Sequence, residues 1–207
     1  MPARIQVYAG VNGAGKSSIG GAEIRAQGAD YYNPDEVARD LAAGGVSLEA
    51  ANAQAWATGR ALLEQAIDSG SDFAFETTLG GSTITRLLHE AASRGREVFV
   101  WYVGLANADL HVARVRARVG RGGHDIPEEL IRQRYERSRL NLIALLPSLK
   151  ELRVYDNSAE GDPTTGVAPR PRLVLHLRRG RVVGPADLAA TPEWARPIVA
   201  AALRSRG

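Results

Sequence analysis

A glycine-rich loop between an apolar strand and a helix constrains the fold of this chain more than any other feature. Residues 4–9 (RIQVYA) alternate apolar side chains as a strand does, and residues 10–17 (GVNGAGKS) follow at once. The spacing G-x-x-x-x-G-K-[ST] is satisfied by Gly10, Gly15, Lys16 and Ser17. Glycines let the backbone fold around an anion so that its N–H groups and the next helix N-terminus face the charge. The loop therefore predicts a nucleotide phosphate site.

Each residue type in the loop has a chemical task. Lys16 is expected to reach the β- and γ-phosphates of ATP, and the Ser17 hydroxyl is expected to bind magnesium (Mg2+). Lys16 is one of only two lysines among 26 basic residues, which indicates that the site requires an ammonium group. The residues expected to hold ATP are Gly10, Asn12, Gly13, Ala14, Gly15, Lys16, Ser17 and Ser18.

Strand-like and helix-like segments alternate along the chain. Expected strands are residues 4–9, 30–33, 72–76, 97–104 and 152–155. Expected helices are residues 16–26, 34–42, 47–69, 82–94, 107–119 and 127–146. This alternation predicts an α/β fold: a P-loop NTPase three-layer sandwich with a mostly parallel, five-stranded sheet.

The pattern changes after residue 156. Residues 157–171 are rich in Gly, Pro, Ser and Thr; residues 173–177 and 181–183 then favour a hairpin, and residues 192–204 a last helix. We expect one domain over residues 1–207, with a core at 1–156 and a C-terminal extension at 157–207.

Composition excludes several classes of protein. There is no cysteine, so disulfides and thiolate metal sites are excluded. The longest apolar run, residues 98–106, is far shorter than the ~20 residues of a membrane span. The net charge of +3 is too small to argue for nucleic acid by itself. We expect a soluble, cytoplasmic protein that does not bind a membrane, and nucleic acid is not its favoured partner.

Carboxylates follow two of the expected strands. Glu76 closes residues 72–76, where it could steer magnesium, and Thr77 and Thr78 follow as hydroxyl donors. A strand-end carboxylate in solvent is the alternative. Asp35 lies in the first turn of a helix capped by Asn33. Its carboxylate could accept the proton of an attacking hydroxyl group. Alternatively, it is present only because a negative charge near a helix N-terminus interacts favourably with the helix dipole. The pattern does not choose between these interpretations.

Arginines gather around a glycine-rich turn. Eight lie between residues 111 and 139, on two expected helices that could close over the phosphates as a helical lid. Arg121 and Arg134 are the candidates to contact the transferring phosphate, although a solvated arginine-rich face is the alternative. His124 in the turn is interpreted as an exposed loop residue, and the other histidines show no metal-ligand spacing.

The ordered set of motifs resembles the zeta-toxin-like family of P-loop kinases, over roughly the first 160 residues. The motifs are AGVNGAGKSS (9–18), NPDEVA (33–38), FETTL (75–79), RVGRGGHDIP (118–127) and RQRY (132–135). The resemblance implies that Asp35 is the general base, that Asp35, Glu76 and Thr78 hold the acceptor, and that Arg121 and Arg134 contact phosphate. Lys16 would act as a catalytic residue, with ATP and Mg2+ as cofactors.

In the toxin members of that family the acceptor is UDP-N-acetylglucosamine, and the resemblance also raises an antitoxin protein as a partner. Two departures bear on the acceptor: the chain is shorter than the toxins, and Gly80 stands where an arginine would be expected. We therefore predict an ATP-dependent kinase for a small hydroxyl-bearing substrate. Two alternatives stay open: a regulatory protein that hydrolyses ATP slowly, and a polynucleotide kinase, which only the basic segment 170–181 supports.

Overall fold

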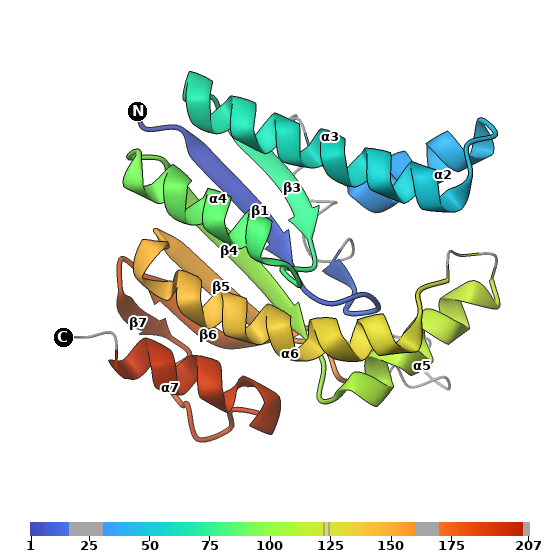
Figure 1. Ribbon diagram of the computed structural model, residues 1–207. Coiled ribbons are helices and arrows are strands. Elements are labelled where there is room, and N and C mark those ends of the chain that lie inside the picture. The colour runs from blue at the N-terminus through green and yellow to red at the C-terminus, as the bar shows by residue number, and fades with distance from the viewer. Residues whose placement is uncertain (17–30, 122, 124, 160–169, 205–207) are drawn as a thin grey trace.

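The computed structural model describes residues 1–16, 31–121, 123, 125–159 and 170–204 (Figure 1). Its strands are β1 (Arg4–Ala9), β2 (Tyr31–Tyr32), β3 (Phe73–Thr77), β4 (Glu97–Gly104), β5 (Glu151–Asp156), β6 (Arg172–Arg178) and β7 (Arg181–Gly184). They form one sheet in the order β2-β3-β1-β4-β5-β6-β7. The five strands from β2 to β5 are parallel, and β6 and β7 are antiparallel to their neighbours.

The mixed α/β fold with a mostly parallel sheet is confirmed, but the sheet has seven strands instead of the expected five. The expected hairpin supplies the difference, because β6 pairs with β5 instead of standing apart. Pairing satisfies the backbone groups that β5 would otherwise expose at a sheet edge. It also buries Leu175 and Leu177 in the main core.

Helices lie at bounds close to those expected, and all except the last connect the parallel strands. They are α2 (Pro34–Ala43), α3 (Leu48–Ser69), α4 (Ser82–Ser93), α5 (Ala108–Val119), α6 (Glu128–Leu145) and α7 (Arg196–Arg204). Side chains of Asn33, Ser47 and Asn107 cap the N-termini of α2, α3 and α5. These polar caps accept backbone N–H groups that a helix leaves unpaired, which is why the sequence marks these starts well. The expected helix at 16–26 lies outside the described residues, except for Lys16.

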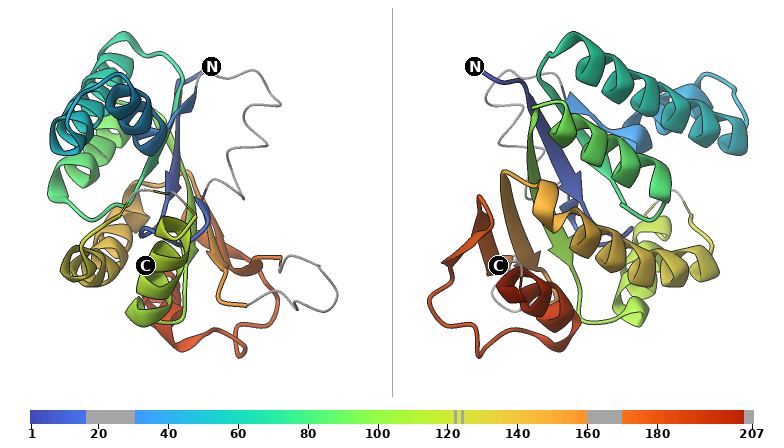
Figure 2. Two further views of the ribbon diagram at one scale, coloured as in Figure 1. Left: turned by 90° about the vertical axis from the view of Figure 1, so that its right-hand side faces the viewer. Right: turned by 60° about the vertical axis from the view of Figure 1, so that its left-hand side comes forward.

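The main core lies between the sheet and one layer of helices. Helices α3, α4 and α6 lie on the same face of the sheet (Figure 2). They bury Leu63, Leu88 and Leu142 against the inward side chains of β1, such as Ile5 and Val7. Strand side chains alternate between faces, so every second residue of β1 joins this core. The arrows of β1, β3 and β4 in Figure 1 end at one edge, near α5 and the start of α6.

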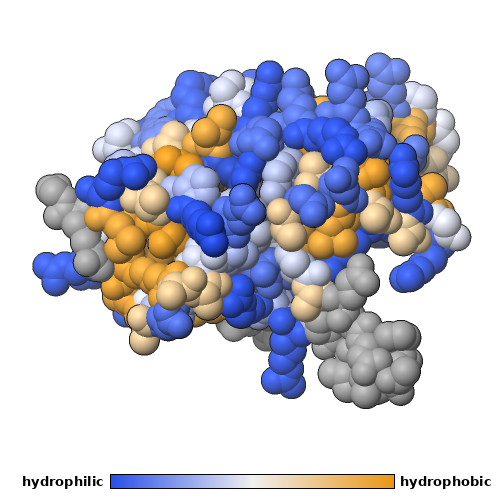
Figure 3. All heavy atoms as spheres, turned by 90° about the horizontal axis from the view of Figure 1, so that it is seen from below, coloured by the Kyte–Doolittle hydropathy of each residue, from blue (hydrophilic) through white to orange (hydrophobic). Residues whose placement is uncertain are grey.

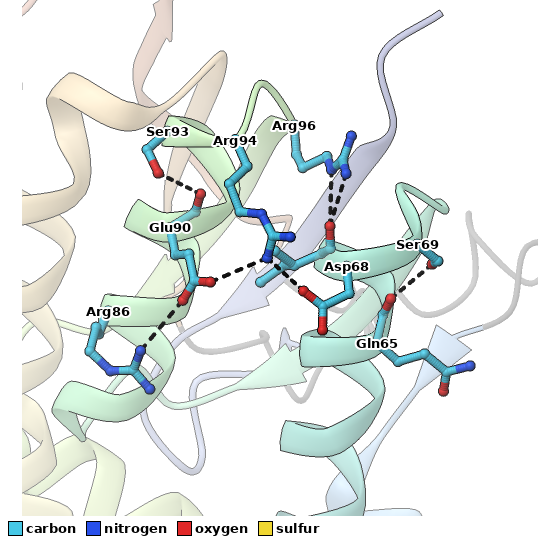
Figure 4. A network of polar contacts seen from close by, with 9 residues as sticks. Gln65, Asp68, Ser69, Arg86, Glu90, Ser93, Arg94 and Arg96 are labelled. Carbon is cyan, nitrogen blue, oxygen red and sulfur yellow. Dashed lines mark hydrogen bonds and ion pairs between the residues drawn. The ribbon is translucent and has the colours of Figure 1, made fainter.

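Polar contacts tie α3 to α4 at the opposite end of the molecule (Figure 4). Arg94 Nη1 donates to Asp68 Oδ1 at 2.6 Å and to Glu90 Oε1 at 3.3 Å. Two nitrogens of Arg96 donate to the carbonyl of Ile67, near the C-terminus of α3. The ion pairs of Arg94 are solvent-exposed, so their contribution to stability is small. Together with the Arg96 hydrogen bonds, they join the ends of the two helices.

The C-terminal segment packs into the main core. Trp194, Ala195, Ile198 and Ala202 are buried there, and Trp194 Nε1 donates to Asp156 Oδ1 at 3.2 Å. Figure 3 shows the molecule from below: hydrophilic side chains are spread over this face, and apolar ones form patches on its left and right sides. Within the described ranges, no helix is long and apolar enough to cross a membrane.

Candidate functional site

The glycine-rich loop leaves β1 beside the ends of β3 and β4. Gly10 has a φ of +148°, and a Cβ at this position would lie 2.3 Å from the carbonyl oxygen of Val103. At Gly15, with φ +88°, a Cβ would lie 2.6 Å from Asn157 Nδ2. At Gly10 a side chain would meet both an unfavourable φ and the fixed Val103 carbonyl; at Gly15 the positive φ disfavours a side chain, and the nearest atom is the end of the Asn157 side chain. The geometry of both positions therefore favours glycine.

Two side chains from distant parts of the chain hold the loop. Asn157 Nδ2 donates to the carbonyl of Ala14 at 2.8 Å. His111 on α5, only 1% exposed, donates from Nδ1 to the carbonyl of Asn12 at 2.9 Å. The pKa of His111 is lowered to about 4, mainly by burial and also by the nearby charges of Lys16 and Arg114. The hydrogen bond to the Asn12 carbonyl raises this pKa, but by less than burial lowers it. His111 is therefore a neutral anchor for the loop.

Lys16 lies at the end of the loop and is 8% exposed. Its charge is close enough to His111 to disfavour a second positive charge there. A nearly buried lysine is rare without an anionic partner, so its placement fits the phosphate-binding role expected from the motif. Ser17 and Ser18, the other residues expected to bind magnesium and ATP, lie outside the described residues.

Asp35 lies in the first turn of α2, immediately after the short strand β2. The side-chain oxygen of Asn33 accepts the backbone N–H groups of Asp35 at 3.0 Å and Glu36 at 3.4 Å. This cap fixes the backbone that carries Asp35 and leaves the Asp35 side chain exposed. An exposed carboxylate on a fixed helix turn can accept a proton from a bound hydroxyl group.

Glu76 is 5% exposed and lies near the end of β3, paired with Tyr8 of β1 just before the loop. The hydroxyl of Tyr31 donates a hydrogen bond to Glu76 Oε1. Burial and the adjacent Glu76 charge raise the pKa of Tyr31, so the phenol stays protonated and keeps donating. This position agrees with the prediction that Glu76 lies at the carboxyl edge of the sheet. Its carboxylate is buried and does not extend into solvent.

The turn after β3 has a strained backbone that other side chains stabilise. Leu79 is fully buried with a φ of +51°, a conformation that costs energy for a residue with a side chain. Thr77 Oγ1 accepts the N–H of Leu79, and Asn141 Nδ2 donates to the Leu79 carbonyl at 2.6 Å. Thr78 Oγ1 in the same turn accepts the N–H of Gly80 at 3.4 Å. The turn therefore holds Thr78 in a defined place.

Arg134 reaches the loop from α6. Its Nη1 donates to Asn12 Oδ1 at 2.7 Å, so the guanidinium and the loop are directly joined. Burial lowers the pKa of Arg134, and the charge of Asp35 opposes that shift. Gly80 makes room for this arginine, because a Cβ at residue 80 would lie 2.7 Å from Arg134 Cγ. The glycine at the position of an expected arginine is thus explained by the space that Arg134 occupies.

A cavity of about 480 Å³ brings most of the predicted site residues together. We call it the Asp35 cavity. It is lined by the loop residue Asn12 and by Asp35, Glu76, Thr78 and Arg134. Lys16 is not in its lining, and Arg121 is exposed in the turn after α5 and does not line it either. Arg134, and not Arg121, is therefore the predicted lid arginine that this structure places at the site.

Sequence reasoning missed several residues that shape the site. Long-range hydrogen bonds, each across at least 45 positions of sequence, come from Tyr31, His111, Asn141 and Asn157; Asn141 makes two of them, to the turn after β3. No spacing rule links residues so far apart. Only Asn157 had a usable signal, since it follows directly after a strand that ends at the site edge.

Solved structures share this fold. The native AvrRxo1-ORF1:-ORF2 complex aligns with a TM-score of 0.64 and 14% identity, over 99% of this chain and 71% of that chain. The same complex with ATP gives 0.63 and 16%, over 98% of this chain and 64% of that chain. The PezAT toxin-antitoxin system of Streptococcus pneumoniae gives 0.50 and 17%, over 75% and 68%. The chain thus shares its α/β fold with these proteins.

A comparison of amino-acid sequences finds a related protein. An uncharacterized protein of Haemophilus influenzae is 31% identical over 132 residues, which cover 62% of this chain and 89% of that protein. The chain belongs to the same family as that protein. No family model matches the chain.

Proposed function

We propose that this protein is an ATP-dependent kinase that transfers the γ-phosphoryl group to a hydroxyl of a small molecule bound in the Asp35 cavity. The observation that carries the proposal is the shared lining of that cavity: Asn12 of the phosphate-binding loop faces the same space as Asp35, Glu76 and Arg134. A donor loop and a candidate base thus border one acceptor site.

Several features support ATP as the phosphoryl donor. The loop has the glycine conformations and the nearly buried lysine of a phosphate site, and a structure of similar fold was solved with ATP. For magnesium, Glu76 offers a carboxylate at the loop edge, with Tyr31 donating to one of its oxygens. Magnesium at such sites is usually held by one or two protein groups together with substrate phosphates and water. Bound magnesium would neutralise charge on the phosphates.

The residues divide the chemistry as follows. The acceptor oxygen forms a bond to the γ-phosphorus while the bond to the β-phosphate oxygen breaks, and ADP leaves with that electron pair. Asp35 accepts the proton of the acceptor hydroxyl, and Arg134 stabilises negative charge on the transferring group. Glu76 and Thr78 orient the acceptor. Lys16 holds the β- and γ-phosphates of the donor.

For the acceptor we propose UDP-N-acetylglucosamine as the first compound to test. The family resemblance suggests it, and the cavity volume lies within the range of about 300–1,000 Å³ that is usual for small-molecule sites. The likeness to PezAT, a toxin-antitoxin system, supports an antitoxin as a candidate partner. We further propose that the protein acts in the cytoplasm.

The two alternatives receive less support. A regulatory protein that hydrolyses ATP slowly does not need a general base at an acceptor site. Here Asp35 lines the cavity, and its charge acts on Arg134. A polynucleotide kinase would require the basic segment 170–181 to continue into the site. That segment forms β6 and β7 at the far edge of the sheet, with β4 and β5 between it and β1.

The test is transfer of labelled phosphate from ATP and magnesium to UDP-N-acetylglucosamine, free sugars and 5′-hydroxyl oligonucleotides. Asp35→Asn should lower transfer by about 10²- to 10⁴-fold, the usual contribution of a general base, while ATP affinity stays unchanged. Asp40→Asn is the matched control, since this carboxylate is exposed on the same helix and does not line the cavity. Phosphate released only to water by the wild-type protein would sink the proposal.

A further inference from the structure

A second groove, of about 350 Å³, lies on the face of the sheet opposite α3, α4 and α6 (Figure 2). Its residues on β1, β4 and β5 alternate with core residues such as Ile5, Val98 and Leu152, so they project from the other face. They lie at the amino ends of these parallel strands, whereas the Asp35 cavity lies at the carboxyl ends. Five cations line this groove, which we call the basic groove: Arg4, Lys150, Arg153, Arg178 and Arg179.

We infer that the basic groove binds an extended acidic segment of a partner protein. The inference does not depend on the kinase proposal, because no residue of the groove lines the Asp35 cavity. It also gives a role to the basic segment 170–181, which the proposed function leaves unused and which supplies Arg178 and Arg179.

The carboxylates of the groove neutralise only part of its positive charge. Two of them, Glu97 and Glu151, line it beside the five cations. Glu97 forms an ion pair with Lys150. Glu151 is shared by three groups: Arg153 Nη2 at 2.9 Å, His176 Nε2 at 2.9 Å and Arg178 Nε at 3.6 Å. The two carboxylates are therefore already engaged.

The remaining positive charge is unfavourable for the empty protein. Within the described part of the chain, Arg4 and Arg179 form no ion pair. Arg178 lies directly opposite Arg181 of β7, and like charges at opposed positions of two strands destabilise the pairing. Carboxylates of a bound segment would neutralise these cations and reduce the repulsion between them.

Arg179 also occupies a backbone position that suits other residues better. With Gly180 it forms the two-residue turn between β6 and β7, and the φ values are +49° and +72°. Such turns prefer Asn or Asp before Gly, because a longer side chain is strained at positive φ. The Arg179 backbone N–H donates to the carbonyl of Lys150 at 2.9 Å, which holds the turn beside the groove. A strained residue at a groove is expected where its side chain serves binding.

Aromatic side chains lie between the outer cations. Phe99 and Trp101 of β4 line the groove and are half-buried. One face of Trp101 stacks on Tyr8 of β1, with ring centres 4.9 Å apart and planes 5° apart. Gln6 of β1 is the cross-strand neighbour of Phe99 and the one uncharged polar side chain in the described lining. The middle of the groove thus offers an apolar contact with a hydrogen-bonding group beside it.

The spacing of the strands sets the spacing of charges in the occupant. Arg4 on β1 and Arg178 on β6 are three strand-to-strand steps apart in the order β1-β4-β5-β6, or about 14 Å. An extended peptide rises about 3.4 Å per residue, so acidic residues about four positions apart would reach both ends. An apolar residue between them would lie over Phe99 of β4.

A nucleic-acid strand fits the groove less well. It carries a phosphate on every unit, so Glu97 and Glu151 would repel some of them, whereas a peptide can carry acidic residues only opposite the cations. Because Tyr8 already covers one face of Trp101, less ring surface is left for a base to stack on.

The experiment measures binding of short labelled peptides by fluorescence anisotropy. The acidic probe carries a pair of glutamates at each end and one central phenylalanine, and its neutral match carries glutamines in their place. The acidic probe should bind wild-type protein about tenfold or more tightly than its match, as several exposed ion pairs together predict. Added salt should reduce this difference, because it screens exposed charges.

Variants assign the binding to the groove. Arg179→Asn and Arg4→Gln should each weaken the acidic probe by about 2- to 5-fold, and the double variant by about 4- to 25-fold. Because Asn suits the turn, Arg179→Asn should not lower the midpoint of thermal unfolding, so a loss of binding is not a loss of folding. Arg39→Asn is the matched control, since Arg39 is exposed on α2 and does not line the groove. Phosphate transfer should be unchanged in Arg179→Asn, so the groove and the kinase proposal succeed or fail separately.

Three results would overturn the inference. The first is equal or absent binding of the acidic and neutral probes to wild-type protein. The second is an affinity of the Arg4→Gln, Arg179→Asn double variant equal to that of Arg39→Asn. The third is a single-stranded RNA that displaces the acidic probe and binds more tightly than the probe does, which would make the groove a nucleic-acid site.

Discussion

At the scale of single residues, Asn12 joins the nucleotide loop to the acceptor site. Its side chain accepts a hydrogen bond from Arg134, and its carbonyl accepts one from His111. A hydrogen bond to a charged donor contributes roughly 1.5–3 kcal/mol when it is not competing with water. We therefore expect Asn12→Ala to lower phosphoryl transfer about tenfold or more, with the larger change in kcat or acceptor KM and not in ATP affinity.

A double-mutant cycle separates this role of Asn12 from direct contact with phosphate. In an Arg134→Ala background, Asn12→Ala should cause little further loss of transfer, because the interaction between them is already gone. Additive losses from the two substitutions would show that Asn12 acts independently of Arg134. Affinity for ATP, measured for all four proteins, reports any separate effect on the loop.

His111 makes a pH-dependent contribution to stability. Its pKa is lowered to about 4 in the folded protein, against about 6.5 for an ordinary histidine. As the pH falls from about 6.5 to 4, the unfolded chain binds a proton that the folded protein does not. The free energy of unfolding should therefore fall over this range, by up to about 3 kcal/mol.

Urea unfolding followed between pH 7.5 and pH 4 measures this effect. His111→Gln removes the titrating group and keeps a donor, so the loss of stability over this window should shrink. His89→Gln is the control, since His89 bonds to Ser148 far from the loop and His111 is still present. The same pH dependence in His111→Gln and in the wild-type protein would contradict the prediction.

At the scale of elements, the N-terminus of α2 carries the candidate base. Asn33 caps this helix and holds the backbone N–H of Asp35. Asn33→Ala should cost about 1 kcal/mol of stability, as loss of an N-cap usually does, and should also lower transfer because Asp35 is less well fixed. Thermal unfolding and the phosphate-transfer assay measure the two effects.

Helix α3 provides a matched control for this prediction. Ser47 caps α3 through the N–H of Ala50 but holds no proposed catalytic residue. Ser47→Ala should therefore reduce stability by a similar amount without a specific loss of transfer. Asn33→Asp, which keeps a capping oxygen, should restore both properties. Equal loss of transfer in the two cap variants would indicate a general effect of stability.

At the scale of the whole molecule, the C-terminal segment completes the core. Trp194 is 3% exposed, lies against Tyr102, and occupies the space that a side chain at Gly104 would need. We propose that residues 157–207 fold with the rest of the chain as one domain. Trp194→Ala should then lower the stability of the entire protein by about 3–5 kcal/mol, as large cavities in a core do.

A single cooperative transition, followed by both far-UV circular dichroism and tryptophan fluorescence, is expected for wild type and variant. Leu203→Ala, at a side chain 40% exposed on α7, should change stability by no more than about 0.5 kcal/mol. Separate transitions for the segment and the core, or an unchanged midpoint in Trp194→Ala, would contradict the proposal of one domain.

Local patterns in the sequence predicted most of the fold. The glycine loop, the alternation of strands and helices, and the cap Asn33 are short-range features, and the structure shows them as expected because each depends on neighbouring residues. The sheet was underestimated by two strands. Strand β6 pairs with the edge of β5 that would otherwise be unpaired, and a long connection separates the two strands in the sequence. No local sequence pattern predicts such a pairing.

For the candidate site, the sequence by itself predicted the phosphate-binding loop and indicated Asp35, Glu76 and Thr78 as candidates, because each lies at or soon after the end of an expected strand and these ends meet at one edge of the sheet. Only the tertiary structure placed Arg134 at the cavity and Arg121 outside its lining, and only it brought Tyr31 and His111 to the site. The physical reason is the helix packing: which side chains on α3, α5 and α6 reach the cavity is set by how each helix is rotated against the core, through contacts between residues far apart in the chain.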